Sequence, residues 1–334
     1  KDIDDKTDGL LIKSENFQAL NLLMERYKEQ VKCVYIDPPY NTNASEIIYK
    51  NSYKHSSWIS LMYDRIYLSR FLMCDDAILE VAIDDMENYY LKLILDNIFG
   101  IDNYVGTICI QHNPRGRADA KHISPAHEYL HLYSKDYLHL RTNQLIQSEE
   151  ELVSKYTIVD DNSAYRELPF KRSGSNSRRI DRPNLFYPIY YHPDENKLSL
   201  EKKSEDYVEI LPLDSNGDER VWRWGAEKAS SLFETEFVVK RNSNGGFTLY
   251  VKDRIKSTIK PKTFWYGPKY DASSYGTMLL KTLFDKPEFS YPKSINAVFD
   301  ALYIGTDDDS IVIDYFAGSG TTAHAVINLN REDG

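Results

Sequence analysis

The feature that most constrains this chain is a run of six residues that ends at two prolines. Residues 31–36 (VKCVYI) are rich in apolar, β-branched and aromatic side chains, and Asp37, Pro38, Pro39 and Tyr40 follow directly. The run predicts a buried strand that must stop there, because proline lacks an N–H and fixes φ. Asp37 is therefore expected at the carboxyl end of a strand, beside a stiff turn with a free Pro38 carbonyl. On its own, D-P-P-Y is also compatible with an ordinary proline turn.

Strands and helices are predicted to alternate on both sides of this turn. The apolar spacing predicts a strand and then a helix within 9–28, a helix over 56–73, a strand over 77–85, a helix over 86–100, and strands over 104–111 and 128–134. After residue 276 the alternation returns, with a helix over 294–304 and a strand over 310–316. This alternation predicts an α/β fold with a doubly wound, mostly parallel sheet, whose ligands bind beyond the carboxyl ends of the strands.

Composition limits the class of protein. The chain has 334 residues and is 42% hydrophobic, which is enough for a large core or two domains. It contains no apolar run of about 18 residues, and its first residues do not resemble a signal peptide, so we expect a cytoplasmic protein without a membrane partner. Cys33, Cys74 and Cys109 are scattered, as is typical of reduced thiols. The net charge of -10 argues against indiscriminate binding of polyanions, but not against a local basic surface.

The segment 141–275 interrupts the α/β alternation. Its short aromatic stretches, punctuated by proline, predict a separate mixed or β-rich subdomain inserted between 1–140 and 276–334, which form one discontinuous domain. A basic loop in this segment carries Lys171, Arg172, Arg178, Arg179 and Arg182. Such a loop is either a solvated surface or a contact for phosphates, and the sequence alone leaves both interpretations open.

A second motif near the end of the chain, SIVIDYFAGSGTTAHAV, predicts a strand, a glycine turn and a helix. Gly318 and Gly320 let the backbone approach a ligand, and the helix N-terminus offers free N–H groups. The third glycine of a dinucleotide fingerprint is missing and Asp314 would repel a pyrophosphate, which argues against a nicotinamide or flavin cofactor. S-adenosylmethionine fits better. Its carboxylate can accept the helix N–H groups, its amine can approach Asp314, and the Tyr40 and Phe316 rings can attract its sulfonium.

Together the two motifs resemble those of the amino-methyltransferases that act on DNA. The order, with D-P-P-Y first and F-A-G-S-G-T-T last, is similar to that of the β group of adenine-N6 enzymes. Further stretches, among them IDDMENYYLKLILDNIFGIDNYVGTI, HEYLHLYSK, VWRWG and YPKSINAVFDALYIG, resemble the modification (Mod) subunit of Type III restriction-modification systems. The resemblance implies a Rossmann-like, S-adenosylmethionine-dependent sheet with circularly permuted motifs and a target recognition subdomain at 141–275. It also implies double-stranded DNA as the substrate, a homodimer, and a restriction (Res) subunit as a partner.

The resemblance also implies roles for individual residues. Asp37 and the Pro38 carbonyl would hold the target amino group, Pro39 would complete the turn, and Tyr40 would stack on the flipped base. The implied cofactor-binding residues are Glu15, Asn16, Lys293, Asp314, Phe316, Gly318, Gly320 and Thr321. The expected DNA-binding residues are Arg115 and Arg117, in the loop before strand 128–134, and Lys171, Arg172, Arg178, Arg179 and Arg182. The chain stops at Gly334, before the strand whose acidic residue holds the cofactor ribose in this family, and so resembles a C-terminally truncated fragment.

Other functions stay open at this point. A cytosine-N4 enzyme would use similar machinery, although Asp before P-P-Y favours adenine by family resemblance. Methyltransferases of RNA or of protein amides more often resemble Asn-P-P-Y. A catalytically silent nucleic-acid-binding partner could keep the same fold, and absent binding of S-adenosylmethionine would reveal it.

One further pattern resembles a zinc site. His127 and His131 belong to an H-E-x-x-H sequence, which binds zinc when both imidazoles share one face of a helix. Here the surrounding residues predict a strand, in which positions four apart are separated by about 13 Å. That distance is too long for two ligands of one zinc ion, so we expect no metal.

Overall fold

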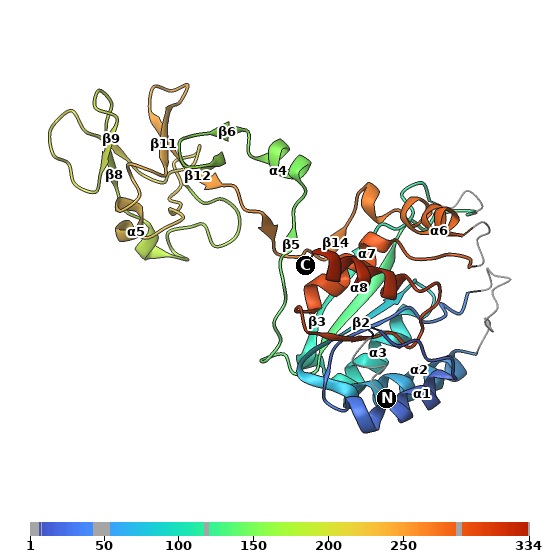
Figure 1. The fold of residues 1–334 in the computed structure, drawn as a ribbon. Helices are drawn as coiled ribbons and strands as arrows, with labels where there is room; N and C mark the ends of the chain where they lie inside the picture. Colours follow the sequence, from blue (N-terminus) through green and yellow to red (C-terminus); the bar gives the residue numbers. More distant parts are fainter. Residues whose placement is uncertain (1–6, 8, 43–53, 117–119, 285–288, 333–334) are drawn as a thin grey trace. The chain divides into compact units, whose positions relative to one another are not determined.

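The structure is a computed structural model that describes residues 7, 9–42, 54–116, 120–284 and 289–332. The chain divides into two compact units (Figure 1). The first unit comprises Lys1–Leu145 and Ile259–Gly334, and the second comprises Ile146–Thr258. At the boundary, β5 (Leu145–Ile146) pairs with β13 (Thr258–Ile259). Among the described helices, none has the length and apolar character that a membrane crossing requires.

The first unit is built on a six-stranded sheet with the order β14-β3-β4-β2-β1-β15. The strands are β1 (Val31–Ile36), β2 (Met73–Ile83), β3 (Tyr104–Ile110), β4 (Glu128–Ser134), β14 (Phe264–Trp265) and β15 (Ile311–Ile313). β1 is parallel to β2 and β15, and β3 is parallel to β14, whereas β4 is antiparallel to both of its neighbours. Because β4 runs in the reverse direction, its first residue, Glu128, lies at the edge where the parallel strands end.

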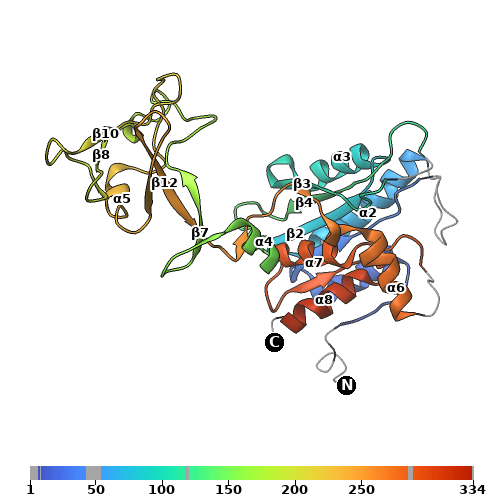
Figure 2. The ribbon, with the colours of Figure 1, turned by 90° about the horizontal axis from the view of Figure 1, so that it is seen from above.

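Helices cover both faces of this sheet, as Figures 1 and 2 show. One face packs against α1 (Asn16–Tyr27), α2 (His55–Leu72) and α3 (Asn88–Phe99), and the other against α7 (Ile295–Gly305) and α8 (Thr321–Glu332). Successive side chains of β1 point to opposite faces of the sheet, and both faces are covered, so the whole strand is buried. Val34 and Ile36 pack in the core beside α1, α2 and α3, whereas Cys33 and Tyr35 pack in the core beside α7 and α8. The remaining elements of this unit are short, namely η2 (Ile101–Asn103), η4 (Pro268–Tyr270), η5 (Ser273–Thr277) and α6 (Met278–Leu283).

Most predicted elements of this unit are confirmed. The strand at 128–134 has the predicted bounds, and the third helix ends as predicted at Gly100, which has a φ of 86° and donates its N–H to the Asp96 carbonyl. The predicted strand at the start of 9–28 is wrong. Leu10 and Leu11 are 64% and 87% exposed, and this run has no neighbouring strand to hydrogen bond among the described residues. The strand predicted over 310–316 is also shorter, because Asp314 already belongs to the following turn.

The second unit is rich in antiparallel strands. A four-stranded sheet has the order β11-β12-β7-β6, and a three-stranded sheet has the order β10-β8-β9, in which Figure 2 shows β8 beside β10. The strands are β6 (Ile158–Val159), β7 (Ala164–Pro169), β8 (Ile189–His192), β9 (Lys197–Ser199), β10 (Val208–Ile210), β11 (Phe237–Arg241) and β12 (Phe247–Arg254). The helical segments are α4 (Glu149–Lys155), η3 (Pro183–Leu185) and α5 (Ala226–Ser230).

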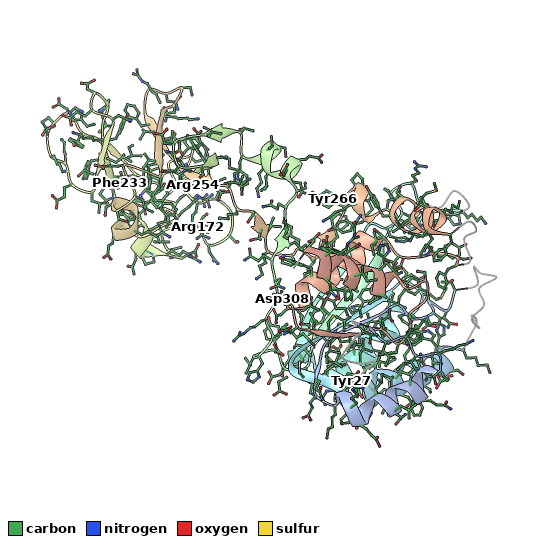
Figure 3. The ribbon with its side chains drawn as sticks, in the orientation of Figure 1. Tyr27, Arg172, Phe233, Arg254, Tyr266 and Asp308 are labelled. Atoms are coloured by element: carbon green, nitrogen blue, oxygen red, sulfur yellow. The ribbon has the colours of Figure 1, made fainter. Side chains whose placement is uncertain are left out.

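Aromatic packing and one charge cluster hold the second unit together. Phe170 stacks on Trp222 in the core, where Phe233 packs as well. Arg254, labelled with Phe233 in Figure 3, forms ion pairs with Asp160 and Glu236. The second unit thus has a core of its own. Residues 259–275, which the sequence assigned to the insertion, belong instead to the first unit, where β14 extends the main sheet.

Candidate active site

The D-P-P-Y turn leaves β1 at the carboxyl edge of the sheet, and α2 and α3 fasten it. Trp58 of α2 donates its indole N–H to the Pro39 carbonyl at 2.8 Å. The amide of Asn41 donates to the buried carboxylate of Glu87, which also contacts His55 at 2.9 Å. The Pro38 carbonyl, in contrast, accepts no hydrogen bond from any described residue. The turn is therefore fixed at Pro39 and Asn41, and one acceptor next to Asp37 is left for a ligand.

Asp37 and Tyr40 meet a lysine and a second carboxylate at this edge. The Lys293 ammonium lies 3.2 Å from Asp37 Oδ1 and 2.6 Å from Glu128 Oε2. The Tyr40 hydroxyl donates to Glu128 Oε2 at 2.9 Å, and Lys293 Nζ contacts that hydroxyl and lies 4.3 Å from the centroid of the Tyr40 ring. Two carboxylates thus share one ammonium group.

Burial and charge move the pKa values of this cluster in different directions. Burial raises the pKa of Asp37, and the nearby Lys293 only partly opposes this. Burial also acts on Glu128, but the closer Lys293 ammonium outweighs it and holds the pKa of Glu128 below its ordinary value. Burial acts to lower the pKa of Lys293, yet the two carboxylates hold it above its ordinary value. Lys293 is therefore charged and is more tightly bound to Glu128 than to Asp37.

The glycine turn after β15 is closed by Asp314. Its carboxylate accepts the Phe316 N–H at 2.8 Å and the Thr322 hydroxyl at 2.6 Å. Gly318 and Gly320 have φ values of 52° and 79°, a region that residues with a Cβ rarely adopt. Burial raises the pKa of Asp314 to about 6. The carboxylate thus has a structural task in the turn, and its contact with a ligand amine stays a prediction.

Asp37 and the glycine turn line one cavity, whereas Pro38, Pro39, Tyr40 and Gly320 are not among its lining residues. Tyr35 and Phe289 lie at this cavity together with six residues that the sequence singled out, namely Asp37, Lys293, Asp314, Phe316, Gly318 and Thr321. Stretches nearly three hundred residues apart in the chain therefore face the same space, because β1 and β15 are adjacent parallel strands. A carboxylate, a glycine turn and the start of a helix therefore border the same space.

Glu15 and Asn16 lie outside the set of residues that line the cavity. Glu15 is the N-cap of α1, where it accepts the Gln18 N–H at 3.2 Å, and it pairs with Arg65 of α2. The Asn16 amide donates to the Tyr315 carbonyl at 3.0 Å. These contacts connect the start of α1 with α2 and with the glycine turn, and a contact with a cofactor adenine stays a prediction.

The predicted DNA-binding residues differ in their surroundings. Lys171 donates to the Leu213 carbonyl, and Arg179 pairs with Glu219 at 2.8 Å and lies 4.3 Å from the centroid of the Phe186 ring. The guanidinium groups of four other residues make no hydrogen bond, ion pair or cation–π contact with any described residue. These are Arg115, in the loop after β3, and Arg172, Arg178 and Arg182, in the second unit. Arg117 lies outside the described residues.

Sequence reasoning missed Trp58, Glu87 and Glu128. Glu128 was considered only as part of the H-E-x-x-H pattern, which lies on a strand as predicted. His131 of that pattern is buried between Thr107 at 2.8 Å and Asn88 at 2.6 Å, and burial lowers its pKa to about 4. The sequence did contain a signal for Glu128, because it is an acidic residue at the start of a predicted apolar strand. A carboxylate that is buried in this way requires a polar or charged partner.

The fold and the cavity define an α/β protein with a cavity at the carboxyl edge of its sheet, between Asp37 and a glycine turn. The chain belongs to the DNA methylase family, whose model matches residues 31–332. This match confirms the family resemblance of the two motifs.

Named relatives support the same family. The chain is 32% identical to the Type III restriction-modification enzyme EcoPI Mod subunit of Escherichia phage P1, with 97% of this chain and 56% of that protein covered. It is also 32% identical to the Type II methyltransferase M.KpnI of Klebsiella pneumoniae, with 99% of this chain and 79% of that protein covered. The EcoP15I Mod subunit of Escherichia coli is 29% identical, with coverages of 97% and 56%. The chain therefore spans little more than half the length of these Mod subunits.

Proposed function

We propose that this chain carries the catalytic centre of a methyltransferase that moves a methyl group from S-adenosylmethionine to the N6 amino group of adenine in DNA. The observation that carries the proposal is the single cavity shared by Asp37 and Gly318. Membership of the DNA methylase family supports the substrate class. The order of the motifs, with the proline turn first and the glycine turn last, supports a circularly permuted, Rossmann-like sheet.

The residues that line the cavity have the chemistry that the cofactor requires. Gly318 has no Cβ, and a Cβ built there would lie 3.3 Å from the Phe289 ring, so the backbone itself forms that wall. Phe316, Gly320 and Thr321 follow the turn into α8, whose first N–H groups suit a carboxylate. Asp314 and Lys293 complete the proposed contacts. Bound S-adenosylmethionine supplies a methyl group on an electrophilic sulfonium.

Asp37 and Pro38 activate the amino group in this mechanism. The N6 lone pair of adenine is delocalised into the ring and is a poor nucleophile. When the Asp37 carboxylate and the Pro38 carbonyl accept hydrogen bonds from the two N6–H groups, the lone pair localises on nitrogen and points to the methyl group. Once the methyl group is attached, the surplus N6 proton is lost to water. Asp37 also stabilises the positive charge that develops, and loss of such an electrostatic contact costs about 100- to 1,000-fold in rate.

A base inside a duplex cannot reach Asp37, so it must be flipped out at a cost of a few kcal/mol. Tyr40 stacks on the flipped base, and stacking of this kind contributes about 1–3 kcal/mol. Glu128 accepts the Tyr40 hydroxyl and thereby holds the ring at the mouth of the catalytic turn.

The second unit, Ile146–Thr258, is the proposed target recognition region. Arg172, Arg178 and Arg182 support this role because their guanidinium groups are unpaired among the described residues. Arg115 and Arg117 are proposed contacts from the first unit. The likeness to Mod subunits supports a place in a restriction-modification system, with a homodimer and a Res subunit as partners.

Cytosine-N4 methylation is the second candidate. The Asp37 carboxylate and the Pro38 carbonyl can accept the two protons of a cytosine amino group in the same way. The product nucleoside distinguishes the two reactions.

The test is transfer of a labelled methyl group from S-adenosylmethionine to DNA of mixed sequence, followed by digestion to nucleosides. We expect N6-methyladenine. Labelled N4-methylcytosine would favour the second candidate, and no incorporation by the full chain would contradict both.

The catalytic role of Asp37 has its own variant. Asp37→Ala should abolish transfer while calorimetry still detects binding of S-adenosylmethionine. The matched control is Asp308→Ala, since Asp308 is exposed and does not line the cavity (Figure 3). An active Asp37→Ala protein would exclude the mechanism.

A further inference from the structure

Glu128 is a buried carboxylate next to the D-P-P-Y turn. In the proposed mechanism it holds the Tyr40 ring, but it has no influence on Asp37, which accepts a hydrogen bond from the target amino group. The Glu128 side chain is 5% exposed, and it accepts hydrogen bonds from Lys293 Nζ at 2.6 Å and from the Tyr40 hydroxyl at 2.9 Å. Its backbone is fixed because β4 pairs with both β2 and β3. Glu128 is thus a rigid anion at the edge of the site.

We propose that Glu128 is a positioning residue for methyl transfer, because it binds the Lys293 ammonium and so leaves Asp37 available to the target amino group. This inference rests on the proposed methyltransferase function. The distances support it, since Lys293 Nζ is 2.6 Å from Glu128 but 3.2 Å from Asp37. Without the Glu128 charge, Asp37 becomes the nearest carboxylate to this ammonium. A close ion pair there occupies the oxygen that must accept a hydrogen bond from N6.

The same carboxylate orients Tyr40. One oxygen of Glu128 receives both the Tyr40 hydroxyl and Lys293, so the ring and the ammonium group are held together. The change Glu128→Gln separates these two tasks. Glutamine keeps an oxygen that can accept the Tyr40 hydroxyl, but it lacks the negative charge that attracts Lys293.

The charges around Asp37 determine the sign of the expected pH effect. The charged and titratable groups that surround it and its partners are Tyr35, Tyr40, Glu80, His112, Glu128, Lys293 and Asp314. The Glu128 charge raises the pKa of Asp37, whereas Lys293 lowers it. Removal of the Glu128 charge therefore lowers the pKa of Asp37 in two ways. A repelling negative charge is lost, and Lys293 moves closer to Asp37. Because Asp37 acts in its ionised form, the acid limb of the kcat/KM profile moves to lower pH.

The experiment compares the full chain with Glu128→Gln in methyl transfer to DNA across the pH range in which the wild type is active. We expect kcat to fall about 10- to 100-fold, on the scale of removing one electrostatic interaction, with binding of S-adenosylmethionine unchanged in calorimetry. The acid limb of kcat/KM should also move to lower pH. A lower kcat with the acid limb in place would indicate a merely structural role and overturn the inference, as would an unchanged kcat.

Glu80→Gln is the matched control. Glu80 is a fully buried carboxyl in the neighbouring strand β2, and it makes no contact with Lys293. The isosteric change there should leave the acid limb in place. An equal shift of the limb in Glu80→Gln would overturn the inference.

Lys293→Met provides an independent test of the route. If Glu128 acts through Lys293, Glu128→Gln must reduce kcat much less in the Lys293→Met background than in the wild type. Equal losses in both backgrounds would overturn the inference. The experiment distinguishes this inference from the proposed function. An inactive wild type would contradict methyl transfer itself. An active wild type in which the effects of Glu128→Gln and Lys293→Met on kcat are additive would contradict only the role of Glu128.

Discussion

Trp58 donates its indole N–H to the Pro39 carbonyl at 2.8 Å, which fastens the D-P-P-Y turn to α2. Trp58→Phe keeps most of the ring but removes this donor. We expect a loss of stability of about 1–3 kcal/mol from the unpaired carbonyl, and a lower kcat because the turn is held less firmly. Thermal unfolding and methyl-transfer kinetics measure the two effects.

Trp265→Phe is the control for this change. Trp265 is also buried, but its indole N–H has no hydrogen-bond partner among the described residues. Its replacement removes no hydrogen bond and should cost less stability than Trp58→Phe. The explanation fails if the two variants lose equal stability and kcat is unaffected in both.

Gly318→Ala tests the glycine turn. Its φ of 52° costs a residue with a Cβ about 1–2 kcal/mol, and the new Cβ would crowd the Phe289 ring. Affinity for S-adenosylmethionine should therefore fall about tenfold in calorimetry. Gly217→Ala imposes a similar backbone strain in the second unit, where the Cβ meets open space, and should leave that affinity unchanged. Wild-type affinity in Gly318→Ala would refute the assignment of this turn to the cofactor.

Glu80 predicts a pH-dependent stability. Both of its carboxylate oxygens are buried without a hydrogen-bond partner among the described residues, and burial raises its pKa well above the ordinary 4.5. A group with a raised pKa in the folded state destabilises the fold increasingly as pH rises from about 4.5 toward the folded pKa. Glu80→Met removes this cost, so the variant should exceed the wild type by a margin that grows with pH to about 1–3 kcal/mol. Denaturant unfolding at several pH values measures the margin, and a margin independent of pH would contradict the prediction.

The unpaired arginines of the second unit predict the salt dependence of DNA binding. Replacement of Arg172, Arg178 and Arg182 by Gln should weaken binding, and the slope of log K against log salt should fall by about one for each phosphate that is no longer neutralised. Arg179 is already paired with Glu219, so the neutral double change Arg179→Gln, Glu219→Gln is the control. Titrations at several salt concentrations provide the slopes. Equal slopes for the wild type and the triple variant would show that these arginines do not bind phosphates.

The sequence by itself determined the elements whose pattern is local. The apolar run before Pro38 fixed the end of β1, Gly100 fixed the end of α3, and the alternation at 128–134 gave the bounds of β4. Proline and glycine act on their own backbone, and side-chain periodicity reports on the residues that carry it. The D-P-P-Y turn and the glycine turn were predictable for the same reason.

Only the tertiary structure decided which side chains meet. Lys293 and Glu128 are separated by 165 positions, and they touch because β4 enters the sheet in reverse and places its first residue at the carboxyl edge of its neighbours. No local pattern encodes that direction, and so Glu128 was first considered as part of a zinc sequence. Likewise, the exposure of Leu11 depends on the absence of a neighbouring strand among the described residues. The periodicity of apolar residues determines whether a segment forms a helix or a strand. The order and direction of the strands determine which charged groups lie within hydrogen-bonding distance of one another.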